Sequence, residues 1–243
     1  MCDNLRSNSV RSFVFLVTFF LYAAYGSAYE IITVVNGGSI AGRVKFAGSV
    51  TPPQKVEISK DRDECGKTEK IDESILVGED RGLQNVLVSI LEIQKGKVFT
   101  DSVPILDQRD CRYVPHLVLV PVGKPLTILN NDGVLHSVHT HSVKNPAFNR
   151  AQSKFKTEMQ EILAYPEIIK LTCDVHSWMS GWIIVQEHPY FTVSGENGFF
   201  ELLDVPPGEY VVSFWHEVLG IKEISLVVEP DKQTFILEIF INS

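Results

Sequence analysis

The sequence predicts an all-β protein built of sandwiches, and three observations lead to this prediction. Residues 29–243 contain no long run of apolar positions at helical spacing. Their apolar residues instead form short runs separated by Gly, Pro, Asn and Asp, as strands and turns do. The segment 194–199 also has an Asn-Gly pair at its centre, which is typical of a hairpin turn.

The expected strands follow directly from the apolar runs. They are Ile40–Phe46, Val86–Ile90, Leu117–Val120, Leu126–Leu129, Ile168–Leu171, Ile183–Val185, Phe199–Leu203, Tyr210–Trp215 and Ile224–Val228. One segment, Lys154–Ala164, predicts a helical turn or a short helix instead. Short strands at this spacing favour two-layered sandwiches.

Residues 1–28 predict a secretory signal peptide rather than a folded element. Arg6 and Arg11 precede the apolar run Phe13–Ala24, and Gly26-Ser27-Ala28 is a cleavage site of the small-x-small type. The alternative is an uncleaved membrane anchor, for which the run is short. We expect a periplasmic or secreted protein with no stable membrane span after cleavage.

The charge of the chain disfavours nucleic acid as a partner. The formal net charge is −8, and it becomes −9 without residues 1–28, whose three charged residues contribute +1. An acidic surface repels phosphate backbones and attracts basic partner proteins. The 215 residues that remain are enough for one large or two small domains.

The most specific chemical signal lies between two expected strands. Cys173, His176 and Met179 bring a thiolate, an imidazole and a thioether within seven residues. Soft sulfur ligands favour Cu(I) and imidazole suits copper in general, so the set is typical of an electron-transfer copper site. A tight loop can point all three inward, whereas a helix would place Met179 nearly two turns from Cys173. The alternative is a coincidence or a decayed site.

A second imidazole is needed to complete such a site. His136 supplies a candidate at the end of the turn Asn130-Asn131-Asp132-Gly133-Val134-Leu135. The sequence therefore predicts one copper ion held by His136, Cys173, His176 and Met179.

These motifs resemble the cupredoxins, or blue copper proteins. The Cys-x-x-His-x-x-Met loop is similar to that of amicyanin, and the Asn-Asn-x-Gly-x-x-His turn is similar to that of plastocyanin. The resemblance covers about residues 106–186 and implies a Greek-key β-sandwich with one type 1 copper and four ligands: His136, Cys173, His176 and Met179. Leu135 and Ser137 depart from the family, which often has Pro and Asn there. That Asn ties the two ligand loops together, and Ser137 could donate similarly.

The cysteine count agrees with this interpretation. Cys2 leaves with the signal peptide, and copper on Cys173 would leave Cys65 and Cys111 to pair in an oxidising compartment. The alternatives are two free buried thiols, or separate roles for Cys111 and the nearby His116.

The two ends of the chain carry a second resemblance. The strand Gly38-Ser39-Ile40-Ala41-Gly42-Arg43-Val44 and the turn Val205-Pro206-Pro207-Gly208 resemble the carboxypeptidase regulatory-like, transthyretin-type sandwich. We expect a signal peptide at 1–28, an N-terminal β segment at 29–95, a copper domain at 96–187 and a regulatory-like segment at 188–243. The copper domain would be inserted into the second, smaller sandwich. The alternative is a linear arrangement of modules.

The cupredoxin resemblance also implies where a redox partner binds. His176 would be the exposed edge through which the electron leaves, with Trp178 beside it. Trp178 and Trp182 bracket Met179, which is consistent with a hydrophobic rim or with plain packing.

Three functions remain open from the sequence. The first is a single-electron carrier that is not an enzyme. The second is a non-redox copper-binding or scaffold protein of the cell envelope. The third is a multicopper enzyme, which needs a second copper centre; the other histidines are His116, His139, His141, His188 and His216. His139 and His141 should share one strand face, opposite His136. Copper stoichiometry separates the third function from the first.

Overall fold

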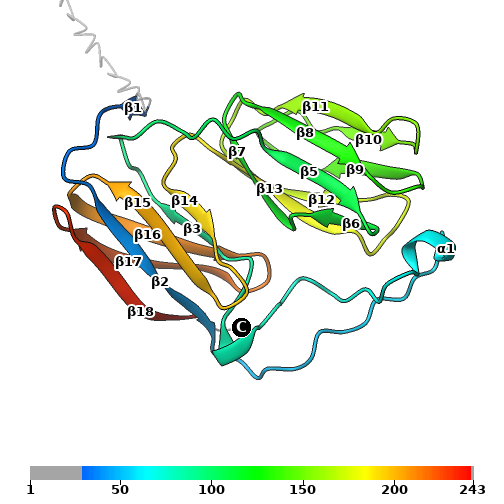
Figure 1. Cartoon of the computed structure of the whole chain (residues 1–243), viewed down its shortest axis with the longest axis horizontal. Coiled ribbons are helices and arrows are strands. Elements are labelled where there is room, and N and C mark those ends of the chain that lie inside the picture. Colours follow the sequence, from blue (N-terminus) through cyan, green and yellow to red (C-terminus); the bar gives the residue numbers. More distant parts are fainter. Residues whose placement is uncertain (1–28, 242–243) are drawn as a thin grey trace, which may run out of the picture.

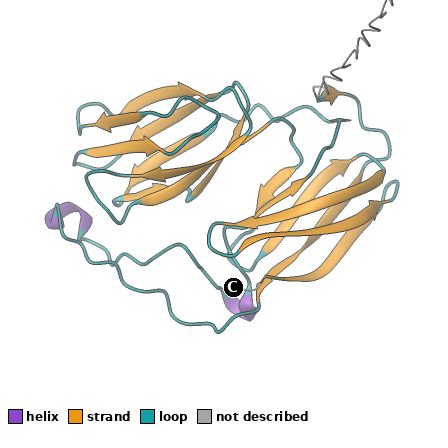
Figure 2. Cartoon of the chain, turned by 180° about the vertical axis from the view of Figure 1, so that it is seen from behind, coloured by secondary structure: helices purple, strands orange, loops and turns teal. Residues whose placement is uncertain are grey.

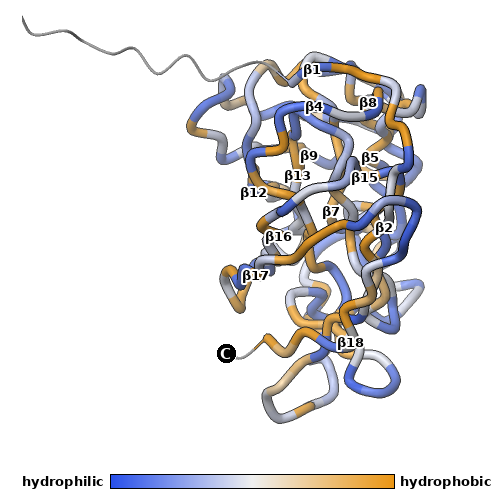
Figure 3. Tube along the Cα trace, turned by 90° about the vertical axis from the view of Figure 1, so that its left-hand side faces the viewer, coloured by the Kyte–Doolittle hydropathy of each residue, from blue (hydrophilic) through white to orange (hydrophobic). Residues whose placement is uncertain are grey.

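The computed structural model describes residues 29–241, and the signal peptide expected at 1–28 lies outside them. Nearly all regular structure is β, as predicted, and it forms two bodies that lie side by side (Figure 1). Hydrophobic and hydrophilic stretches alternate many times along both bodies (Figure 3). Within the described residues, no helix has the length and apolar character needed to cross a membrane.

The first body is a sandwich of a five-stranded and a four-stranded sheet. The five-stranded sheet has the order β10 (Asn149–Gln152), β9 (His136–Thr140), β12 (Glu167–Thr172), β13 (Ser180–Gln186) and β7 (Leu117–Pro121). The four-stranded sheet has the order β11 (Glu158–Ile162), β8 (Pro125–Asn130), β5 (Ile105–Arg109) and β6 (Arg112–Val114). Apolar side chains such as Leu106, Ile128 and Ile169 fill the space between the sheets.

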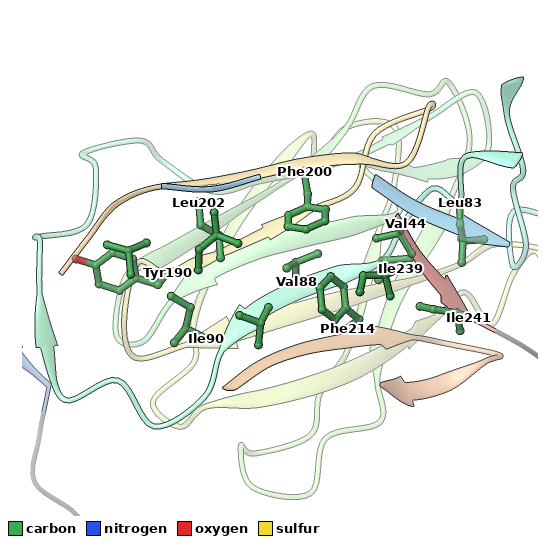
Figure 4. Packing of buried hydrophobic residues seen from close by; sticks show 14 of the residues in the cluster. Val44, Leu83, Val88, Ile90, Tyr190, Phe200, Leu202, Phe214, Ile239 and Ile241 are labelled. Carbon is green, nitrogen blue, oxygen red and sulfur yellow. The ribbon is translucent and has the colours of Figure 1, made fainter. Parts of the chain in front are cut away.

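The second body is also a sandwich, and it combines residues from both ends of the chain. One sheet has the order β14 (Phe191–Val193), β3 (Leu87–Ile90), β16 (Gly208–His216) and β17 (Gly220–Val228). The other has the order β15 (Phe199–Val205), β2 (Gly38–Phe46) and β18 (Gln233–Ile241). Phe200 and Phe214 meet edge to face between the sheets, with ring centroids 5.4 Å apart (Figure 4). Strands β1 (Glu30–Ile31) and β4 (Lys95–Gly96) form a short parallel pair.

Every strand expected from an apolar run is present. The helical expectation for Lys154–Ala164 is wrong, because residues 158–162 form β11 and pair with β8. The side chains of β11 alternate between exposed and half-buried positions, which suits the edge of a sheet. The sequence shows this strand weakly, because its half-buried positions are Met159 and Glu161 and only one of these two residues is apolar.

A shared apolar contact fixes the two bodies against each other. Leu87 of the second body and Ile184 of the first belong to one small buried cluster. The indole of Trp182 packs against Trp215 at 5.0 Å between ring centroids. Glu217 accepts a hydrogen bond from Trp182 Nε1 (2.9 Å). Trp182 therefore packs between the bodies instead of forming a rim around a metal.

Residues 47–78, which we call the arm, leave β2 and run along the first body before they return to the second (Figures 1 and 2). The two halves of the arm pair loosely, with Lys55 opposite Ile71 in an isolated bridge. Near the tip lies the four-residue helix α1 (Arg62–Cys65). The 3-10 turn η1 (Glu79–Arg81) follows the arm.

The loop between β9 and β10 provides a test of pH dependence. The Glu167 carboxylate accepts hydrogen bonds from the backbone N–H groups of Val143, Lys144 and Asn145. Burial opposes ionisation, but these bonds outweigh it and lower the pKa of Glu167 from 4.5 to about 2. The carboxylate therefore stabilises the fold fully above its unfolded pKa, and the contribution disappears as pH falls toward about 2.

We expect Glu167→Gln to lower the free energy of unfolding by about 2 kcal/mol at neutral pH. The difference from wild type should shrink steadily between about pH 5 and pH 2. Urea unfolding at several pH values measures this. A difference that is the same at pH 3 and pH 7 would contradict the role of the ionised carboxylate.

Candidate metal centre

The segment Cys173–Met179 forms a closed loop between β12 and β13. The Met179 N–H donates to the carbonyl of His176 (3.0 Å), and the Cys173 N–H donates to the carbonyl of Met179 (3.2 Å). Strands β12 and β13 pair in register up to Thr172 and Ser180. The loop is thus fixed at both ends, and it directs Cys173, His176 and Met179 into the first body, where all three are buried.

The turn before β9 brings His136 to the same place. The side chain of Asn130 donates to the carbonyl of Val134 (3.0 Å) and accepts from the Asp132 N–H (3.1 Å). The second of these bonds closes an Asx turn, for which Asn is well suited, and the first extends the same turn toward β9. His136 follows as the first residue of β9 and is fully buried.

Three of the four predicted ligands have their donor atoms close together. One nitrogen each of His136 and His176 and the sulfur of Cys173 all lie within 4.8 Å of one another. The Nδ1 atoms of the two imidazoles are 3.0 Å apart, and the rings meet edge to face. A second group of possible ligands shares His136 but includes Cys111, whose sulfur is in a disulfide.

Met179 shares a buried apolar cluster with Cys173, Val138 and Leu171. Its side chain is 2% exposed. The structure therefore places the Met179 side chain in the core, at the end of the loop that carries Cys173 and His176.

Both imidazoles are oriented by carboxylates on their outer nitrogens. The Nε2 atom of His136 lies 2.8 Å from Asp132 Oδ2, and the Nε2 atom of His176 lies 2.8 Å from Asp61 Oδ2. A carboxylate fixes the tautomer of an imidazole in this way, as is common for metal-binding histidines. In both residues Nδ1 then faces the interior of the site.

Asp132 connects the His136 loop to the neighbouring turn. Its carboxylate also accepts the backbone N–H groups of Asp110 and Cys111, each at 2.8 Å. Burial disfavours the charged carboxylate, yet the bonds from His136 and the two backbone groups keep its pKa below the ordinary value. The same pair raises the pKa of His136 to about 9, against the opposing effect of burial.

Ser137 links the loop that carries Cys173 to the strand that carries His136. Its hydroxyl accepts the Asp174 N–H (2.8 Å) and lies 3.7 Å from Cys173 Sγ. Its own N–H points to the same sulfur at 3.4 Å. Burial raises the pKa of Cys173, but the hydrogen bond with His136 and the backbone donors lower it to about 6. The thiolate, which is the form that binds metals, is thus favoured at neutral pH.

The expectation of an exposed His176 edge is wrong. The His176 side chain is fully buried, because Asp61 and Cys65 of the arm lie against its Nε2 atom. Trp178 packs on the same imidazole with ring centroids 4.9 Å apart, and its Nε1–H donates to the carbonyl of Cys111 (3.2 Å). The arm, which the sequence did not reveal as a neighbour of the site, covers the edge.

The predicted disulfide between Cys65 and Cys111 is present. It joins the tip of the arm to the turn between β5 and β6. The sulfur of Cys65 lies 3.8 Å from His176 Nε2, so the disulfide is next to a candidate ligand. Cys173 is left as the free buried thiol.

The remaining histidines lie apart from this cluster. His139 and His141 stack with ring centroids 4.6 Å apart, on the opposite side of the strand from His136. His116 contacts Glu217 at the boundary of the two bodies. His188 and His216 are buried in the second body, and burial lowers the pKa of each to about 4.

Two residues of the site were not identified from the sequence. Asp132 lies inside the quoted turn, and its spacing of four residues from His136 is a usable local signal. Asp61 is 115 residues from His176 along the chain, and no local pattern connects them.

A scan against protein-family models and a search of curated proteins both gave no match. Several solved structures share part of the fold. A copper-containing nitrite reductase from Thermus scotoductus matches 38% of this chain with 18% identity and a TM-score of 0.33. The match spans 24% of that reductase.

Two amicyanin structures match in a similar way. A reduced variant matches 36% of this chain and 85% of its own, with 20% identity and a TM-score of 0.32. An oxidized variant matches 47% of this chain and 93% of its own, with 17% identity and the same TM-score. These neighbours are cupredoxins, and the similarity is partial.

Proposed function

We propose that this protein binds one copper ion through His136, Cys173 and His176, with Met179 as a weaker fourth ligand, and that it carries single electrons. The single observation that supports the proposal most is the convergence of one thiolate and two imidazoles in a buried cluster. A buried, low-pKa thiolate beside two oriented imidazoles is a donor set for copper. Copper in such a set supplies exchange between Cu(I) and Cu(II).

The protein's own residues would perform four tasks. Cys173 would hold the ion as a thiolate, aided by the N–H of Ser137. The carboxylates of Asp132 and Asp61 would keep Nδ1 of each histidine free for the metal. The fixed loops would keep the donors in one arrangement in both oxidation states, which favours rapid electron exchange. The apolar core around Met179 would exclude water.

The cellular role is part of the same proposal. We infer that the protein is exported, is not an enzyme and meets a redox partner protein on the face that carries Trp178. We also propose that the second body belongs to the carboxypeptidase regulatory-like sandwiches and positions the carrier. The competing function is a copper-binding scaffold, in which the same ligands hold the ion without electron exchange.

Copper titration of metal-free protein followed by voltammetry tests this proposal. We expect one copper per chain and a reversible one-electron response. Copper binding without a reversible response would favour the scaffold. No binding by folded protein would overturn the copper proposal, and a second copper per chain would favour an enzyme.

A further inference from the structure

We propose that the arm is a built-in cover of the metal centre and that Asp61 near its tip is a positioning residue that favours Cu(II) over Cu(I). The inference rests on the copper site proposed above. Neither feature follows from the ligand motifs, because the arm lies outside the segment that carries them. Both features are inferred from the contacts that the arm makes with His176.

The first observation is the contact itself. Asp61 Oδ2 lies 2.8 Å from His176 Nε2, and the imidazole is fully buried although its loop also carries the exposed residues Asp174 and Ser177. Asp61 has a left-handed backbone (φ 48°, ψ 43°), a conformation that Asp adopts more readily than most residues with a side chain. This conformation directs the carboxylate toward the imidazole from the first residue before α1.

The second observation is that several independent bonds hold the arm on the site. The disulfide between Cys65 and Cys111 joins its tip to the first body. Lys70, whose side chain is 1% exposed, pairs with Asp110 at 2.8 Å, and Arg112 pairs with Glu73 at 2.8 Å. On the arm these contacts lie at the tip and on the segment that follows it, and on the first body they fall on the adjacent residues Asp110, Cys111 and Arg112. The outer part of the arm is therefore attached to the first body by three separate contacts.

The residues that anchor the arm are also hydrogen-bonded to the residue that orients a candidate ligand. Asp132 binds the backbone N–H groups of Asp110 and Cys111, and it also binds His136. The same short turn thus anchors the arm and orients one histidine. Asp61 orients the other. The two outer carboxylates and the disulfide form one connected structure around the pair of imidazoles.

The carboxylate has a definite electrostatic effect. A negative charge that accepts the Nε2–H of a ligand makes the imidazole a stronger donor and favours the more highly charged ion. Removing that charge should weaken Cu(II) binding relative to Cu(I) by about tenfold, which is a rise of about 59 mV in the reduction potential of a one-electron couple. The cover has a separate effect, because it keeps a partner from direct contact with His176.

Asp61→Asn tests the positioning role by the reduction potential of the copper-loaded protein. Asp63→Asn is the matched control, since it removes the same charge two residues away. Asp63 is exposed, and its side chain has no hydrogen-bond or ion-pair partner among residues 29–241. We expect a rise for Asp61→Asn and little change for Asp63→Asn. Equal shifts in both variants would overturn the role of the hydrogen bond.

The cover is tested without metal, by carbethoxylation of histidines with diethyl pyrocarbonate and peptide mapping. In the metal-free wild type, we expect exposed His141 to react and His176 to be protected. Asp61→Gly suits the left-handed backbone and should raise the reaction rate of His176 at least about tenfold. Loss of the disulfide in Cys65→Ser/Cys111→Ser should raise it further.

Reaction of His176 as fast as His141 in the wild type would overturn the cover. So would continued protection of His176 in a folded variant that combines Asp61→Gly with Cys65→Ser/Cys111→Ser. Because this measurement needs no copper, it distinguishes a failed cover from a failed copper proposal. If copper does not bind, the voltammetric comparison fails while the mapping result still decides whether the arm covers His176.

Discussion

Replacing Cys173 with serine should abolish the intense thiolate-to-copper absorption band of the copper-loaded protein and turn a blue solution nearly colourless. Cys173 is the free thiol of the site, and its low pKa makes it a thiolate at neutral pH. A serine hydroxyl is neutral and hard, so it is a poor ligand for either oxidation state of copper. We expect copper binding to weaken by about a hundredfold or more, which is about 2.7 kcal/mol.

Visible spectroscopy with competitive copper titration measures both effects. Ser177→Ala is a suitable control, because Ser177 is an exposed residue of the same loop. The control should keep the band and the affinity. A Cys173→Ser protein that retains the band would show that the thiolate is not a ligand.

Removing the disulfide should lower the free energy of unfolding strongly. Cys65 and Cys111 are separated by 46 residues and are both fully buried. Closing a loop of this length restricts the unfolded chain, and the chain-entropy relation gives about 4 kcal/mol. Cys65→Ser/Cys111→Ser should therefore lose about this much of the free energy of unfolding.

Chemical denaturation of the double variant and of the wild type, with and without a dithiol reductant, measures the loss. The wild type should become as unstable as the variant when its disulfide is reduced. A double variant with the wild-type midpoint would mean that the arm is held by its ion pairs alone, such as Lys70 with Asp110.

The sequence predicted the parts of the fold that depend on local patterns. Apolar runs such as Ile183–Val185 identified strands because a strand buried on one or both faces needs them. It missed β11, where the exposed edge carries few apolar residues, and Lys154–Ala164 was wrongly expected to contain a helical turn. Along such an edge strand, exposed and half-buried positions alternate, but the residue types differ too little for the sequence to reveal the alternation.

The candidate site divides in the same way. Three of the candidate ligands lie within one loop, and His136 lies in a recognisable turn, so short-range spacing was sufficient to propose them. The cover over His176 was missed because Asp61 reaches it from 115 residues away. A sequence of polar arm residues gives no sign of what they contact. The His176 imidazole was therefore expected to have an exposed edge, whereas the structure buries it.

X-ray absorption at the copper edge of the loaded protein tests the central claim most directly. The claim is that one thiolate and two imidazoles, from Cys173, His136 and His176, converge on a single ion. The account predicts one short sulfur scatterer and two imidazole nitrogen scatterers around copper. In His136→Ala, the number of imidazole scatterers should fall from two to one. A shell of nitrogen and oxygen alone would contradict it.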